Sequence, residues 1–182
     1  SRDSGETTAE LVPVPSQSEQ QAEEGEQDDS AEGATEADDE EGEPEEPVVV
    51  YPAPENALPL AHIVAPSGNI SCLLDDTGVI CSIYAYSFTD ASLANCASAP
   101  ATLNTMDEGT TVSCSVAPVT APGATTLSYG DYATNGFGAC YSTEYGMSCW
   151  NTTTGDSFAV ARGGFMTGAE GLIPVNSMPW VG

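Results

Sequence analysis

Hydrophobic and polar positions alternate with a period of two over several short stretches that are separated by turn residues. The clearest example surrounds Cys72 and Cys81, which are separated by eight residues. If these cysteines face each other on antiparallel strands, Leu73 faces Ile80 and Asp75–Gly78 forms a four-residue loop that ends in glycine. Directly opposed residues on such strands are about 4.5–5.5 Å apart, which a disulfide can span. The pattern therefore predicts a disulfide-clamped β-hairpin.

The same pattern returns 68 residues later in the chain. Cys140 and Cys149 are again separated by eight residues, and Thr143–Gly146 again places a glycine at the end of the loop. Zinc half-sites are the alternative interpretation, but their cysteines are usually two to four residues apart. We therefore expect two hairpin disulfides. By elimination Cys96 pairs with Cys114, although six cysteines allow 15 connectivities.

The rest of the folded part shows further short alternating stretches. Strands are predicted over residues 61–65, 79–84, 111–116, 125–129 and 157–162. Asp90–Ala94 is expected to open a short helix with Asp90 as its cap. Short strands with turn signals between them favour a small all-β fold, namely a disulfide-stapled antiparallel sandwich or an open barrel. We assign this domain to residues 60–167 and expect an irregular C-terminal tail over residues 168–182.

Residues 1–59 differ in composition from the domain that follows. They hold 19 of the 28 acidic residues and, between positions 19 and 46, no aromatic and no large apolar residue. Such a segment cannot bury enough apolar surface to offset its chain entropy. We expect a disordered, solubilising acidic linker. The functional alternative is a spacer that carries the domain away from a membrane.

The charge and the cysteines limit the partners and the compartment. The net charge is −26, and Arg2 and Arg162 are the only basic residues. This composition argues against nucleic acid, whose binding depends on neutralising phosphates. Six cysteines in a small domain indicate an oxidising, extracytoplasmic compartment. The sequence shows no apolar run long enough to span a membrane, and we expect it to begin after a removed signal, a lipidated cysteine or a membrane anchor.

Residues that could carry chemistry are few. His62 is the only histidine, and no G-x-S-x-G motif frames a serine, so we expect no catalytic residue, metal site or cofactor. Arg162 is interpreted as a partner in a structural ion pair. The candidates for an interaction surface are two loop aspartates and two aromatic residues with a polar edge: Asp75, Asp76, Tyr145 and Trp150.

Several spaced motifs resemble a known family. They are Pro66-Ser67-Gly68-Asn69-Ile70-x-Cys72, Gly78-Val79-x-Cys81, Gly138-x-Cys140, Gly146-Met147-x-Cys149 and Phe158-x-Val160-x-Arg162. Over about residues 60–165 they resemble an exported domain of unknown function found in actinobacterial lipoproteins and membrane-anchored envelope proteins. The resemblance implies an extracytoplasmic location, an N-terminal anchor and three disulfides, and it implies no catalytic residues.

These observations lead to a functional hypothesis. We expect a non-enzymatic, anchored envelope domain that binds a protein or cell-wall component of the envelope, or that serves as an accessory subunit of a membrane complex. The alternative is a small hydrolase that acts on cell-wall polymers. A third possibility is a mainly structural spacer.

Overall fold

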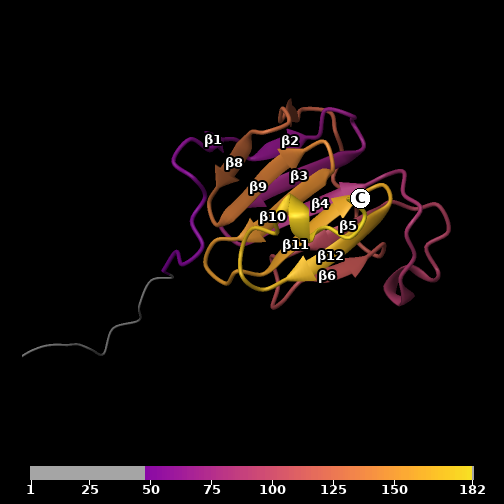
Figure 1. Cartoon of the computed structure of the whole chain (residues 1–182). Helices are drawn as coiled ribbons and strands as arrows, with labels where there is room; N and C mark the ends of the chain where they lie inside the picture. The colour runs from indigo at the N-terminus through magenta and orange to yellow at the C-terminus, as the bar shows by residue number, and fades with distance from the viewer. Residues whose placement is uncertain (1–47, 182) are drawn as a thin grey trace, which may run out of the picture. The chain divides into compact units, whose positions relative to one another are not determined.

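The computed structural model describes residues 48–181. The acidic segment up to residue 47, for which the sequence predicts disorder, lies outside these described residues. The described part consists of strands and two short 3-10 helices, arranged as two six-stranded sheets that face each other (Figure 1). The predicted all-β sandwich is therefore confirmed, and the two sheets do not close into a barrel.

One sheet is built from a meander of five consecutive antiparallel strands. These are β2 (His62–Val64), β3 (Ile70–Asp75), β4 (Gly78–Ile83), β5 (Ala101–Asn104) and β6 (Thr111–Ser113). The other sheet is built in the same way from β8 (Tyr132–Asn135), β9 (Gly138–Thr143), β10 (Gly146–Asn151), β11 (Ser157–Ala161) and β12 (Gly164–Gly168). Figure 1 shows the second meander, in orange to yellow, in front of the first.

The two meanders exchange their leading strands. β1 (Leu58–Pro59) precedes the first meander but pairs in parallel with β8 of the second, with Leu58 opposite Ala133. β7 (Thr125–Thr126) precedes the second meander but pairs in parallel with β2, with Thr125 opposite Ile63. The sheets are consequently mixed, whereas the sequence predicted a purely antiparallel arrangement. Each half of the domain therefore has the same arrangement, a leading strand that joins the other sheet followed by a five-stranded meander. The domain is an internal repeat with pseudo-two-fold symmetry.

All three predicted disulfides are present in the structure. Cys72 pairs with Cys81 and Cys140 with Cys149, each across an antiparallel strand pair, with Cα atoms 4.1 and 4.0 Å apart. The third disulfide joins Cys96, which follows the first 3-10 helix, to the residue after β6 (Cys114).

The hairpin loops are shorter than predicted. Asp75 still pairs with Gly78, and the second hairpin ends in the same way, so each loop has two residues instead of four. The glycines have positive φ angles of +134° and +147°, and their main role is close approach to the neighbouring strand. A Cβ at Gly78 would lie 2.9 Å from Thr105 Oγ1, and one at Gly146 would lie 2.7 Å from the carbonyl oxygen of Val160.

The hydrophobic core lies between the two sheets, and the two hairpin disulfides lie at its centre. The Sγ atoms of Cys81 and Cys149 are 3.5 Å apart, so the disulfides are in van der Waals contact. Large side chains from both sheets, among them Phe158, Leu103 and Ile63, are fully buried in the same cluster. Burial of this apolar surface is the main favourable contribution to folding.

The segment after β12 forms a second, smaller cluster. Ile173 and Met178, on either side of the 3-10 helix η3 (Val175–Ser177), are buried together with Ala159 of β11. Neighbouring residues on a strand point to opposite faces, so Phe158 lies in the core and Ala159 on the outer face of the same sheet. The C-terminal segment therefore covers part of that outer face.

The predicted short helix is a 3-10 helix, η2 (Ala91–Leu93), and its cap is confirmed. Asp90 accepts hydrogen bonds from the hydroxyl and the backbone N–H of Ser92. These bonds favour the charged carboxylate and lower the pKa of Asp90 below its ordinary value. No helix among residues 48–181 is long and apolar enough to cross a membrane.

Candidate functional site

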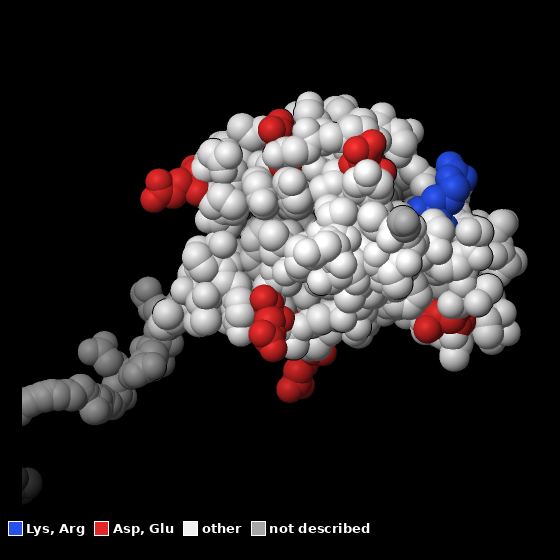
Figure 2. Space-filling view, viewed as in Figure 1, with Lys and Arg blue, Asp and Glu red and all other residues white. Residues whose placement is uncertain are grey.

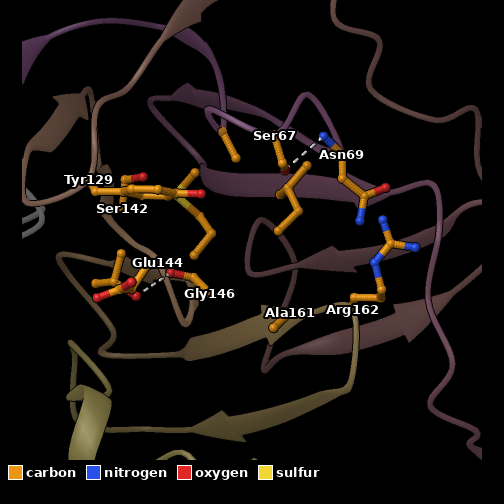
Figure 3. A pocket seen from close by; sticks show the side chains of 12 residues that line it. Ser67, Asn69, Tyr129, Ser142, Glu144, Gly146, Ala161 and Arg162 are labelled. Carbon is orange, nitrogen blue, oxygen red and sulfur yellow. Dashed lines mark hydrogen bonds between the residues drawn. The ribbon is translucent and has the colours of Figure 1, made fainter. Parts of the chain in front are cut away.

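A cavity of about 170 Å³ opens between the sheets at one end of the sandwich, and we call it the Arg162 pocket. Four connections meet there: the β2–β3 turn, the β7–β8 loop, the β9–β10 hairpin and the β11–β12 turn (Figure 3). Its polar lining residues are Ser67, Asn69, Tyr129, Ser142, Thr143, Glu144 and Arg162.

Arg162 is the only lysine or arginine among residues 48–181. It is the blue group in Figure 2, and no carboxylate lies beside it on the face in view. No carboxylate among residues 48–181 lies within salt-bridge distance of Arg162, so the predicted ion pair has no partner in this part of the chain. Its backbone carbonyl accepts a hydrogen bond of 2.8 Å from the Ser87 N–H, which fixes the main chain and leaves the guanidinium exposed at the pocket.

Ser142 places an unpartnered hydroxyl in the wall of the pocket. It follows Cys140 by two residues on β9, so both side chains point into the space between the sheets. Ser142 is 1% exposed, and its Oγ has no hydrogen-bond partner. Within residues 48–181 the buried hydroxyls of Ser71 and Ser157 share this state, but those residues do not line the pocket. Buried hydroxyls normally have a partner, so Ser142 is an unusual residue for the wall of a pocket.

Glu144 lies on a hairpin tip that is held by several hydrogen bonds. The Thr143 hydroxyl donates to the Gly146 carbonyl at 2.8 Å and accepts from the Tyr145 N–H at 3.1 Å. The Trp180 indole N–H donates to the Tyr145 carbonyl at 2.7 Å. The exposed Glu144 side chain is therefore carried by an ordered turn, and Figure 3 shows it on the opposite side of the pocket from Arg162.

Asn69 lines the pocket but has a structural role. Its side-chain amide donates to the Ala85 carbonyl at 2.8 Å, and its Oδ1 accepts from the Ala85 N–H at 2.7 Å. The Ser67 hydroxyl accepts from the Asn69 N–H at 3.3 Å. These bonds hold the β2–β3 turn in place, and they leave Asn69 with little capacity to bind a ligand directly.

The pseudo-two-fold repeat generates an equivalent end of the sandwich, and that end is closed. There the two-residue β8–β9 turn binds the β3–β4 hairpin directly. The Phe137 N–H donates to the Asp75 carbonyl at 2.8 Å, and the Asn135 amide donates to the Leu74 carbonyl at 2.8 Å. A Cβ at Gly136 would lie 2.4 Å from the backbone of Asp75, so the contact leaves no space.

The open end differs from the closed end in two respects. Five residues connect β2 and β3, whereas two residues connect the equivalent strands β8 and β9. Leu74 pairs with Val79 in the first hairpin, and Ser142 pairs with Met147 at the equivalent place in the second. Leucine fills the closed end, and serine leaves the open end hollow. The Arg162 pocket therefore lies where the chain departs from its own repeat.

A second, more open depression adjoins the pocket, and we call it the tyrosine depression. It has a volume of about 400 Å³, and its lining includes Tyr129, Tyr141, Tyr145 and Glu144. Tyr129 is 52% exposed and Tyr145 44% exposed. Tyr141 stacks on Tyr132, with ring centroids 4.2 Å apart. Burial, and secondarily the neighbouring Tyr141 phenol, raises the pKa of Tyr132 above its ordinary value.

The residues predicted for an interaction surface do not lie together. Tyr145 is exposed at the tyrosine depression, but Asp75 and Asp76 lie on the hairpin at the closed end. Asp75 Oδ1 accepts from the Thr77 N–H at 2.7 Å, as expected for a turn-forming aspartate. Trp150 is 2% exposed, because the chain around residue 51 covers it and accepts its indole hydrogen bond.

Sequence reasoning missed Ser142 and Tyr129 as site residues and gave Arg162 a structural role. Alignment of the two hairpins on their cysteines places Leu74 against Ser142, and this difference was a signal for the pocket in the sequence. The position of Arg162 beside the second hairpin depends on the sheet order and carried no such signal.

His62 and the core cysteines were the other candidates for chemistry. His62 is half-buried on β2, and its Nε2 lies 2.7 Å from the Thr120 carbonyl oxygen, outside the lining of the Arg162 pocket. The four hairpin cysteines have their Sγ atoms within 4.8 Å of one another, a spacing that could suit a metal. They are oxidised in pairs, however, and a cysteine binds zinc as a free thiolate.

Comparison with known proteins adds no relative. The chain matches no known protein family, no curated protein and no solved structure.

Proposed function

We propose that this protein is a non-enzymatic binding domain of the cell envelope and that it binds an envelope component in the Arg162 pocket. Three intramolecular disulfides are typical of extracytoplasmic proteins, which supports the compartment. The observation that carries the proposal is the replacement of a core leucine by Ser142 at the one end of the sandwich where the repeat stays open.

The lining of the pocket suits recognition of a polar group. Arg162, Glu144 and Ser142 line a small cavity together with the apolar side chains of Ile70 and Met147. Ligand sites commonly combine an apolar wall with a few polar groups of this kind. A cavity of about 150 Å³ accepts a molecule the size of benzene. The pocket therefore fits one end group of a larger envelope molecule or a small free ligand.

Hydrolysis of cell-wall polymers is the less favoured function. A nucleophilic Ser142 would need a base within hydrogen-bond reach, but its hydroxyl has no partner and the pocket lining contains no histidine. Glycoside hydrolysis usually needs a pair of carboxylates, and Glu144 is the only carboxylate in this lining. The groups in the pocket can hold a ligand, and they do not form a pair of acid and base.

Retention of the full chain on isolated cell envelopes tests the proposal. We expect Glu144→Gln and Arg162→Gln to reduce retention about ten-fold, because each removes a charged group from the pocket. Asp76→Asn is the matched control, since Asp76 occupies the equivalent hairpin tip outside the pocket and the charge change is the same as for Glu144→Gln. Equal retention of all the variants would contradict the proposal.

A further inference from the structure

We infer that the tyrosine depression is a binding site for an organic ammonium group. Three tyrosine residues from different segments line it: Tyr129 from the β7–β8 loop, Tyr141 from β9 and Tyr145 from the hairpin tip. Glu144 contributes a carboxylate to the same depression. Aromatic rings grouped around a carboxylate are the usual recognition element for alkylammonium groups, because the ring faces attract a cation.

The exposure of these rings is not explained by packing. Tyr84 and Tyr86 show the structural use of tyrosine in this domain, since their hydroxyls donate to the carbonyls of Val119 at 2.6 Å and Ala99 at 2.9 Å. Tyr129 and Tyr145 are instead about half exposed beside each other. Single exposed aromatic residues are ordinary on protein surfaces, but several rings that share one depression indicate a binding surface.

The backbone beneath the rings is held in place before any ligand binds. Both backbone polar groups of Tyr145 are hydrogen-bonded: its N–H donates to the Thr143 hydroxyl, and its carbonyl accepts from the Trp180 indole N–H. Tyr141 is held by its stack on Tyr132. A preorganised site loses less entropy when a ligand binds, so weak cation–π contacts can contribute to affinity.

The charge of the depression selects a cation. Glu144 is its only charged lining residue, and the whole chain carries a net charge of −26. An anion would meet a carboxylate there, whereas an ammonium group gains from Glu144 and from the ring faces. The inference deepens the proposed function, because the depression shares Tyr129 and Glu144 with the Arg162 pocket. A ligand with an ammonium at one end and a carboxylate at the other would span both.

Titration of the full chain with small cations tests the inference. The probes are choline, butylammonium and dimethylbutanol, the neutral analogue of choline in which carbon replaces nitrogen; binding is followed by the NMR shifts of tyrosine ring protons. We expect at least one of the two cations to bind about ten-fold more tightly than dimethylbutanol. Tighter binding of choline indicates a quaternary headgroup as the natural ligand, and tighter binding of butylammonium indicates a primary amine. Equal binding of all three probes, or no binding, overturns the inference.

Substitutions in the tyrosine depression test whether the cation binds there. Tyr145→Leu keeps an apolar side chain and removes the ring, so we expect about two- to five-fold weaker cation binding. Glu144→Gln should weaken binding by a similar factor, while Asp76→Asn should leave it unchanged. If Asp76→Asn weakens binding as much as Glu144→Gln, the attraction is a property of the overall charge and the inference is wrong. The two proposals can fail separately. If no cation binds but envelope retention still depends on Arg162, the proposed function stands and only this inference is overturned.

Discussion

Leu74 and Ser142 occupy equivalent positions in two disulfide-clamped hairpins, and they have opposite effects on the space between the sheets. Leu74 lies opposite Val79 and fills the core, whereas Ser142 lies opposite Met147 and borders a cavity with its hydroxyl unpartnered. An unpartnered buried hydroxyl and an unfilled cavity both reduce stability. A position where stability is lost without a structural gain is a typical feature of a functional site.

Filling the pocket should therefore stabilise the protein. We expect Ser142→Leu to raise the free energy of unfolding by about 1–2 kcal/mol, because it removes the unpartnered hydroxyl and buries apolar surface. Ser142→Ala should give a smaller gain, since it removes the hydroxyl but leaves the cavity. Urea unfolding of the three proteins measures the difference. A loss of stability in Ser142→Leu would show that the pocket cannot accept the side chain that its repeat carries.

The hairpin glycines should differ in their tolerance of a side chain from a glycine in an open turn. Gly146→Ala places a Cβ 2.7 Å from the Val160 carbonyl oxygen, whereas at Gly68, with φ +79°, a Cβ meets no atom within 4 Å. We expect Gly68→Ala to cost about 1 kcal/mol from the left-handed backbone alone, and Gly146→Ala to cost about 3 kcal/mol or more. Thermal unfolding checks the order. Equal costs at the two positions would mean that the strand contact yields easily.

Each hairpin disulfide should contribute measurably to the free energy of unfolding. For each nine-residue separation the chain-entropy account gives about 2–3 kcal/mol. Replacement of Cys140 and Cys149 by alanine should cost at least this much, because the pair is also fully buried in the core. Mass spectrometry of non-reduced peptides from the wild type should find each hairpin cysteine joined to its partner in the same hairpin. A disulfide between the hairpins would contradict the structure.

Tyr132 should titrate above its ordinary value of 10.0, because burial disfavours the phenolate and the neighbouring Tyr141 phenol disfavours it further. A pKa that is higher in the folded state means that this contribution to stability is complete below pH 10 and is lost as the pH rises through the folded-state pKa. Tyr141→Phe keeps the stacked ring and removes only the smaller cause, so the pKa of Tyr132 should fall part of the way. Alkaline titration followed by NMR measures both values. A wild-type pKa at or below 10.0 would contradict this explanation.

Local patterns predicted the local structure well. The register of both hairpins follows from opposed cysteines and alternating side chains, and the Asp90 cap follows from a side chain that competes for nearby N–H groups. The two-residue loops were missed, because in each hairpin the strands continue to a glycine that packs against a neighbouring strand. The contacted residues, Thr105 and Val160, lie outside the hairpins.

The exchange of strands and the pocket depend on contacts that local patterns do not contain. β7 keeps two residues of the strand predicted over residues 125–129, and β1 lies in the segment assigned to the linker. The parallel partners of both strands lie in the other half of the chain. Trp150 looked available for binding because nothing local covers it, yet Tyr51, 99 residues upstream, does so. The pocket brings together connections from both meanders, so only the sheet order shows that Ser142 and Arg162 line the same pocket.

The central claim is that the open end of the sandwich binds an envelope ligand, and amide shift mapping tests it most directly. The full chain is titrated with soluble fragments of digested cell envelope, for the wild type and for Ser142→Leu. We predict shifts that cluster at Ser67, Ser142 and Arg162 in the wild type and that disappear in the variant, whose pocket is filled. Shifts that cluster instead at the closed end around Asp75–Thr77, or that persist unchanged in Ser142→Leu, would contradict the claim.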